Sequence, residues 1–419
     1  MVRVQNFILL YISVLMIISQ TPLAKYLLFV SIPLFVILIT KHLKINSFSF
    51  KKILFLNLIV LIALFSGVVH IYKDNLYYFT RDIMYFIQAP FFLIIGIYLY
   101  QEIRDFRKIL KIIVISSFVV TLYKISYILF HPEIFLLSAL KIRYAYDLSN
   151  GAAIITILIL LYSRKVKYYL FNGKFEIIML LISFLSIVIS FSRTNYVLLI
   201  VIIFLPFLNK IKASLYVYFS LMIFITMLIF GRSFIHMDGG GVQGTDFMSK
   251  LEHSFQEMTI HDYNSRIEVI NDWRGFEAHL GLQQYYKGNV LELFFGQGIG
   301  TIVYTPAWVF QGADTNLDIL PFFHNGYITL LLKTGLFGFI LFFSWLYILL
   351  KTSLRLLRTS HDNQQKLEGF ILQASVFIIL FQTLVVQGIF KTTTPVLLLV
   401  LIGISLQAYA TRIKKALIP

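Results

Sequence analysis

Continuous runs of apolar residues, each about 20 residues long, recur along the whole chain. Such a run forms a helix that crosses the hydrocarbon core of a bilayer, whereas the strands of a membrane barrel show shorter alternating segments. The hydrophobic fraction of 58% and the mean hydropathy of +0.82 exceed what a soluble core of this size requires. The sequence therefore predicts an all-α polytopic membrane protein.

About twelve transmembrane helices are expected. Their predicted ranges are 5–20, 24–40, 53–71, 84–100, 109–130, 149–163, 175–191, 194–209, 213–231, 323–349, 369–389 and 394–411. Helices 1–9 then occupy residues 1–231, a large loop with amphipathic helices occupies 232–322, and helices 10–12 occupy 323–419. The even number of spans places both termini on the same side of the membrane.

The charged residues predict the orientation. The net charge is +16, and 22 of the 36 lysines and arginines fall in the termini and loops of one side. Loops rich in Lys and Arg are cytoplasmic, so both termini are predicted to be cytoplasmic. Topology accounts for the positive charge without nucleic acid as a partner. The chain has no cysteine, which excludes disulfides, thiolate metal sites and a cysteine nucleophile.

The opposite face carries one outsized segment, from Arg232 to Phe323, with 11 acidic and 5 basic residues. We find no repeated unit of three or six spans, which a transporter would favour. A single large external loop points instead to chemistry at that face.

The first candidate site is His324, at the start of the tenth span. At 100° per residue, Gly335 and Gly338 lie within about 40° of His324 on one helical stripe. Small residues on a stripe allow a neighbouring helix to pack closely. His324 would then be fixed at the external end of a helix pair, either as a catalytic residue or as a histidine that only caps the span.

Two arginines stand at expected helix starts. Arg193 begins span eight within Ser190-Phe191-Ser192-Arg193-Thr194-Asn195, and a helix N-terminus with a guanidinium is suited to phosphate. Ser265 and Glu268 have capping-box spacing, so Arg266 lies in the first turn of a loop helix. The apolar stripe expected on that helix is Ile267, Ile270, Trp273 and Leu280. A snorkelling Arg193 and a solvated Arg266 are the simpler alternatives.

The other polar residues of the external segments are weaker candidates. Lys333 lies inside the tenth span, where a charge usually faces protein or a cavity. Asp74 and Asp82 could serve as a base, but no external Asp-x-Asp pair is present, so no metal is expected. Residues assigned to substrate contacts are Arg143, Asn150, Asn195, Arg274, Asn325 and Tyr327.

Together these motifs resemble the O-antigen polymerase and ligase superfamily. His324-Asn325, nine residues, then Gly335-Leu336-Phe337-Gly338 fits its pattern, although the two threonines that often follow in ligases are replaced by Phe339 and Ile340. Ser192-Arg193 resembles the family's Ser-Arg segment. The loop signature of this superfamily is similar to Ser265-Arg266 followed by Phe295-Gly296-Gln297-Gly298-Ile299-Gly300.

The resemblance implies a GT-C-like glycosyltransferase of the bacterial inner membrane with a periplasmic active site. It would transfer glycan from undecaprenyl diphosphate without a cofactor, with Arg193 and Arg266 on the diphosphate and His324 as base. Its partners would be the lipid-linked donor and acceptor, membrane lipid, a chain-length regulator and a flippase. Polymerase is the favoured activity, ligase the alternative, and a lipid-linked oligosaccharide flippase or a structural scaffold for export are less favoured.

Overall fold

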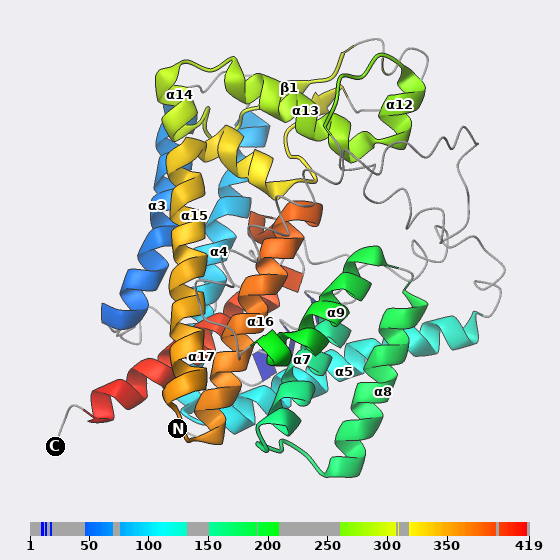
Figure 1. Cartoon of the computed structure of the whole chain (residues 1–419), viewed down its shortest axis with the longest axis vertical. Helices are drawn as coiled ribbons and strands as arrows, with labels where there is room; N and C mark the ends of the chain where they lie inside the picture. The colour runs from blue at the N-terminus through cyan, green and yellow to red at the C-terminus, as the bar shows by residue number, and fades with distance from the viewer. Residues whose placement is uncertain are drawn as a thin grey trace.

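The computed structural model is built almost entirely of helices (Figure 1). It describes residues 10–11, 13–14, 17–18, 47–69, 76–131, 151–190, 192–208, 260–306, 309, 318–390 and 394–416, without the side chains of residues 47–50, 193, 207–208, 394–395 and 414–416. The long helices in this part of the chain are α3 (Ser47–Val69), α4 (Leu76–Ile103), α5 (Phe106–Phe130), α15 (Gly326–Thr359), α16 (Asn363–Val386) and α17 (Thr394–Ala416). The shorter helices that precede the large loop are α7 (Gly151–Lys165), α8 (Gly173–Ile189) and α9 (Arg193–Leu208).

Within the described ranges, 6 helices are long and apolar enough to cross a membrane, so the protein is membrane-embedded. They are α3, α4, α5, α15, α16 and α17. The shorter α7, α8 and α9 also coincide with predicted spans. The predicted spans 24–40 and 213–231 lie outside the described residues, and only short helical pieces of 5–20 are described. The total of twelve spans stays a prediction.

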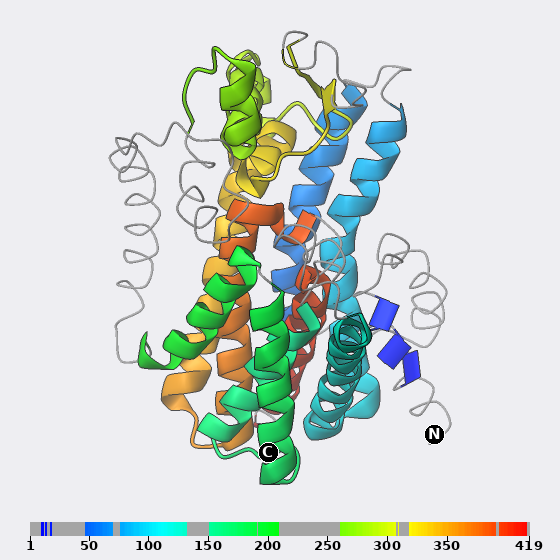
Figure 2. The ribbon, with the colours of Figure 1, turned by 90° about the vertical axis from the view of Figure 1, so that its right-hand side faces the viewer.

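Small residues allow the spanning helices to pack closely. A Cβ added to Gly96 of α4 would lie 2.1 Å from the carbonyl oxygen of Val400 in α17, and one added to Gly403 would lie 2.2 Å from that of Leu93. Helix α15 packs on α3 on one side and on α16 on the other (Figures 1 and 2). The resulting bundle supports the segment that contains His324.

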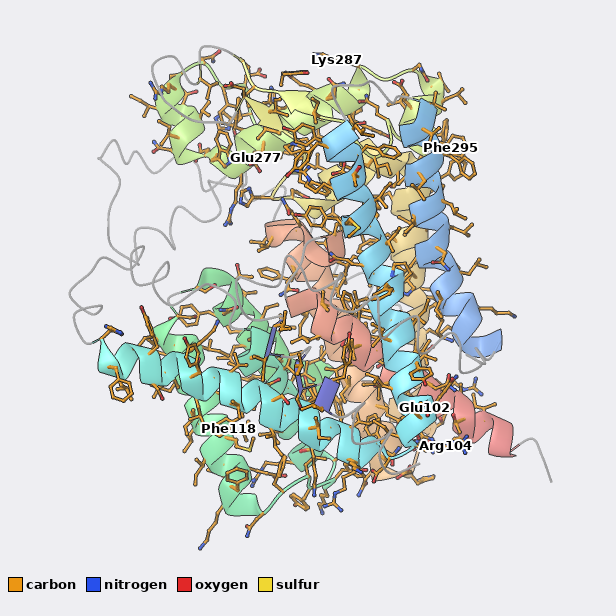
Figure 3. The ribbon with its side chains drawn as sticks, turned by 180° about the vertical axis from the view of Figure 1, so that it is seen from behind. Glu102, Arg104, Phe118, Glu277, Lys287 and Phe295 are labelled. Atoms are coloured by element: carbon orange, nitrogen blue, oxygen red, sulfur yellow. The ribbon has the colours of Figure 1, made fainter. Side chains whose placement is uncertain are left out.

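The described part of the large loop forms a layer at one end of the bundle (Figure 1). This loop layer consists of α12 (Arg266–Asn271), α13 (Trp273–Tyr286), α14 (Val290–Phe295) and the antiparallel strands β1 (Val303–Tyr304) and β2 (Ile319–Leu320). Figure 3 places Glu277, Lys287 and Phe295 at this end and Glu102 and Arg104 at the other. A separate hydrophobic cluster joins the layer to the first part of α15: Tyr263, Val269, Phe276, Ala278, Leu280, Val303, Val309, Leu320, Phe323, Ile328 and Leu332.

The predicted stripe through His324, Gly335 and Gly338 is wrong. His324 precedes α15, whose N-cap is Asn325, and Gly335 breaks the helix with φ 63° and ψ −166°. A constant 100° per residue therefore does not hold across this segment. Gly335 does allow a close approach, because an added Cβ would lie 2.3 Å from the carbonyl carbon of Phe294 at the end of α14. A Cβ on Gly338 would instead meet the side chain of Thr334 on its own helix.

The apolar stripe of the loop helix is also corrected. Ser265 caps α12 as predicted, its hydroxyl accepting the Glu268 N–H at 3.3 Å. The helix ends at Asn271, however, and the non-helical Asp272 (φ −114°, ψ 40°) separates it from α13, so the stripe does not continue. As a result Ile267 and Ile270 are 73% and 52% exposed, and Val269 is the buried residue of α12.

Candidate active site

Two hydrogen bonds of its backbone fix the position of His324. Its N–H donates to Oε2 of Glu277 in α13 at 2.9 Å. Its carbonyl oxygen accepts the N–H of Gln387, at the end of α16, at 2.8 Å. The preceding Phe323 is fully buried, and the following Asn325 caps α15 by accepting the Tyr327 N–H at 3.0 Å. The loop layer and the bundle thus both determine where the imidazole lies.

The imidazole of His324 pairs with the carboxylate of Glu277. Nδ1 lies 2.7 Å from Oε2 of Glu277, whose other oxygen accepts the indole N–H of Trp273 at 2.6 Å. The Glu277 side chain is 5% exposed and that of His324 is 38% exposed. An ionised carboxylate only accepts hydrogen bonds, so a neutral imidazole in this pair donates from Nδ1 and keeps its lone pair on Nε2.

This arrangement makes His324 a proton acceptor of fixed orientation. Nε2 has no protein partner among the described residues, while Glu277 holds the ring and stabilises the imidazolium that forms when a proton arrives. A histidine oriented by a buried carboxylate at a partly exposed position is suited to general base catalysis. Such a pair can accept a proton from a hydroxyl group that reaches Nε2.

Glu277 is a site residue that was not predicted from the sequence. The available signal was its position: Glu277 is four residues after Trp273 and three before Leu280, so it lies on the apolar face of the loop helix. A carboxylate on such a face is buried and needs partners. The contact with His324 spans 47 residues of sequence, which the periodicity of one helix does not show.

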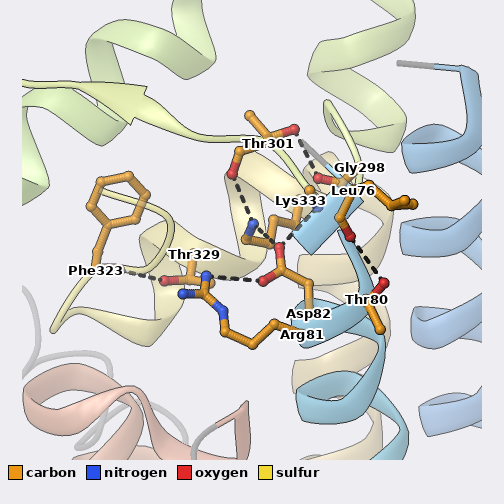
Figure 4. Close-up of polar contacts among 10 residues, drawn as sticks. Leu76, Thr80, Arg81, Asp82, Gly298, Thr301, Phe323, Thr329 and Lys333 are labelled. Atoms are coloured by element: carbon orange, nitrogen blue, oxygen red, sulfur yellow. Dashed lines mark hydrogen bonds and ion pairs between the residues drawn. The ribbon is translucent and has the colours of Figure 1, made fainter. Parts of the chain in front are cut away.

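A second group of charges lies where α4 meets α15 (Figure 4). Lys333 Nζ lies 2.5 Å from Oδ2 of Asp82, and both side chains are fully buried. Arg81 Nη2 lies 3.2 Å from the other oxygen, Oδ1. Oδ2 also accepts the N–H of Gly300 at 2.9 Å, and Lys333 donates to the carbonyl of Thr301 at 3.0 Å. The expectation that Lys333 faces protein is confirmed, and Asp82 is an ion-pair partner.

The glycine-rich segment after α14 connects the loop layer to α15, α3 and α4. Gly296, Gly298 and Gly300 have φ values of 80°, 86° and 84°, which other residues rarely adopt. The Gln297 N–H donates to the carbonyl of Leu332 in α15, and the Ile299 N–H donates to that of Ala63 in α3. A Cβ on Gly298 would lie 1.9 Å from the Gly67 nitrogen, so the backbone contact requires glycine.

The predicted arginines lie at helix starts as expected. Arg266 is the exposed first residue of α12, and Arg274 is half-buried on α13. Glu268 follows Arg266 in the first turn and accepts the Asn264 N–H at 3.1 Å, which together with the Ser265 hydroxyl lowers the pKa of Glu268. Arg193 begins α9, and its side chain lies outside the described residues.

The remaining predicted substrate contacts are mostly in structural roles or not described. Tyr327 is buried and donates its hydroxyl to the Leu380 carbonyl at 2.8 Å. Asn195 is buried and donates to the Ser190 hydroxyl at 3.4 Å. Asn325 caps α15. Arg143 and Asn150 lie outside the described residues, as does Asp74, which was considered as a base.

Comparison with known proteins finds no match. No family model matches the chain, and no curated protein matches it.

Proposed function

We propose that this protein is a glycosyltransferase that polymerises lipid-linked oligosaccharide units, of O-antigen or a related surface polysaccharide, outside the cytoplasmic membrane. The observation that carries the proposal is the His324–Glu277 pair, a proton acceptor of fixed orientation beside the loop layer. Transfer of a sugar to a hydroxyl group requires such a base. The motifs around His324, Arg193 and Arg266 and the glycine-rich segment support the same class of enzyme.

In this mechanism the donor glycan is linked to undecaprenyl diphosphate. The acceptor hydroxyl gives its proton to Nε2 of His324 while its oxygen attacks the anomeric carbon. The bond from that carbon to the phosphate oxygen breaks, and the lipid diphosphate leaves with the electron pair, so the configuration inverts. Arg193 and Arg266 stabilise the charge that grows on the diphosphate, which guanidinium groups do well.

The orientation of the chain supports a periplasmic site. The loop layer lies at the end opposite Arg104 (Figure 3), a residue of the predicted cytoplasmic set. With twelve spans both termini are cytoplasmic, and the site faces the periplasm of the inner membrane. A lipid-linked substrate reaches this position from the outer leaflet, after a flippase has delivered it.

The polymerase and the ligase differ only in the acceptor. A polymerase transfers the growing chain to a second carrier-linked unit, and a ligase transfers it to a lipid A-core sugar. A flippase would make no new glycosidic bond. The three activities therefore give different products from the same lipid-linked substrate.

The experiment is reconstitution of the purified chain in liposomes with an undecaprenyl-diphosphate-linked repeat unit, with and without lipid A-core. We expect a ladder of longer glycans on the carrier without lipid A-core, and the same ladder in excess EDTA. Product on lipid A-core alone would reassign the protein as a ligase. No new glycosidic bond under any condition would exclude both transferases. Loss of the ladder in EDTA, restored by magnesium or manganese, would refute metal independence.

A further inference from the structure

Arg81 is a partly buried cation that the mechanism above does not use. It lies in the second turn of α4, and its side chain is 23% exposed. The guanidinium carbon is 5.0 Å from the ring centroid of Tyr78, 5.9 Å from that of Tyr85 and 5.2 Å from that of Phe322. Three aromatic rings thus hold the guanidinium in one place.

Arg81 shares the carboxylate of Asp82 with Lys333. Asp82 is the one carboxylate, among the residues that the structure describes, that pairs with Arg81 or Lys333. One oxygen of Asp82 is occupied by Lys333 and the Gly300 N–H, and the other by Arg81. Arg81 and Lys333 therefore share one carboxylate, which Arg81 contacts through Nη2.

Arg81 also has unused hydrogen-bonding capacity. Its Nε–H is buried and has no acceptor among the described residues. A guanidinium offers five N–H donors in a planar fork that fits a phosphate. A ligand oxygen at this group would satisfy the buried donor and pair with the guanidinium charge.

The group lies beside the segment that carries His324. Phe322, which contacts Arg81, is two residues before His324. Figure 4 shows the Arg81 side chain extending from α4 and its contact with Asp82. Arg81 and Glu277 thus approach the segment around His324 from different elements, α4 and α13.

We propose that Arg81 binds the phosphate groups of a second lipid-linked diphosphate, the carrier of the acceptor glycan. The inference rests on the proposed polymerase activity, because transfer between two carriers requires two diphosphate sites. Arg193 and Arg266 serve the donor, and Arg81 serves the acceptor on the α4 side of His324. The half-exposed rings of Tyr78 and Tyr85 border the site.

The test is equilibrium binding of a polyprenyl diphosphate to the full chain in detergent, with inorganic diphosphate and phosphatidylglycerol as competitors. The variants are Arg81→Gln and Arg81→Lys, the second of which keeps the charge beside Asp82. The matched control is Arg355→Gln, an exposed arginine near the other end of α15. We expect two bound diphosphates per wild-type chain and one per Arg81→Gln chain. Arg81→Lys should weaken the affected site about tenfold, since it loses the planar fork.

The outcomes are separable from those of the transferase assay. Unchanged stoichiometry and affinity in both Arg81 variants, at unchanged melting temperature, would overturn the inference even if wild-type protein makes the glycan ladder. Full displacement of the carrier by an equal concentration of phosphatidylglycerol would also overturn it, since the site would then bind any anionic headgroup. Loss of one diphosphate in the variants would support the Arg81 site even if no ladder forms, and only the proposed activity would then fail.

Discussion

At the scale of single residues, the carboxylate of Glu277 organises the candidate site. It accepts three N–H groups: the backbone and Nδ1 of His324 and the indole of Trp273. An amide at this position would offer only one oxygen and would place an NH2 group against one of these donors. Glu277 therefore acts through His324, by setting the position and tautomer of its ring.

Replacing Glu277 with Gln should lower kcat by at least about tenfold and leave KM for the lipid-linked substrate nearly unchanged, because only the orientation of the base is lost. Steady-state kinetics of the reconstituted variant measure both. Glu292→Gln is the control, since Glu292 is a carboxylate of the same layer that caps α14. A raised KM at constant kcat would assign Glu277 to substrate binding instead.

At the scale of elements, the break at Gly335 allows α14 to lie against α15. The backbone of Gly335 has φ 63° and ψ −166°, and the end of α14 lies where a Cβ would be. Phe294 and Phe295 also contact the ring of Phe337 just beyond the break, with centroids 5.6 and 5.0 Å away. The break thus fixes the loop layer relative to the bundle.

Gly335→Ala should destabilise the protein by about 1–3 kcal/mol for the backbone conformation alone, with a further loss from the contact at Phe294. The measurement is the apparent Tm in detergent. Gly173→Ala is the matched control, because nothing lies within 4 Å of its added Cβ. A Gly335→Ala protein with the same Tm as the wild type would show that the end of α14 does not pack against this residue.

The helices could be predicted from the sequence because a bilayer imposes a length and a composition on each span. The cap at Ser265 was predictable for a local reason, since it depends on residues three apart. The break at Gly335 and the partner of His324 depend on contacts between distant segments. Helical periodicity carries no information on such contacts, so these features needed the structure.

At the scale of the whole molecule, orientation in the membrane can be tested directly because the chain has no cysteine. Lys287→Cys introduces one thiol in the loop layer, and His361→Cys introduces one between α15 and α16. In intact spheroplasts a membrane-impermeant maleimide should label the first and not the second. Labelling of His361→Cys should appear after permeabilisation. The reverse pattern would place the loop layer in the cytoplasm and contradict a periplasmic site.

The most direct measurement is the rate of glycan transfer by reconstituted His324→Ala. Removal of a general base is typically worth about 10²–10⁴-fold, so we expect a loss of that size at unchanged melting temperature. His279→Ala is the control, a histidine of the same layer that bonds Gln283. Transfer by His324→Ala at a rate near that of the wild type would contradict the assignment of His324 as the base.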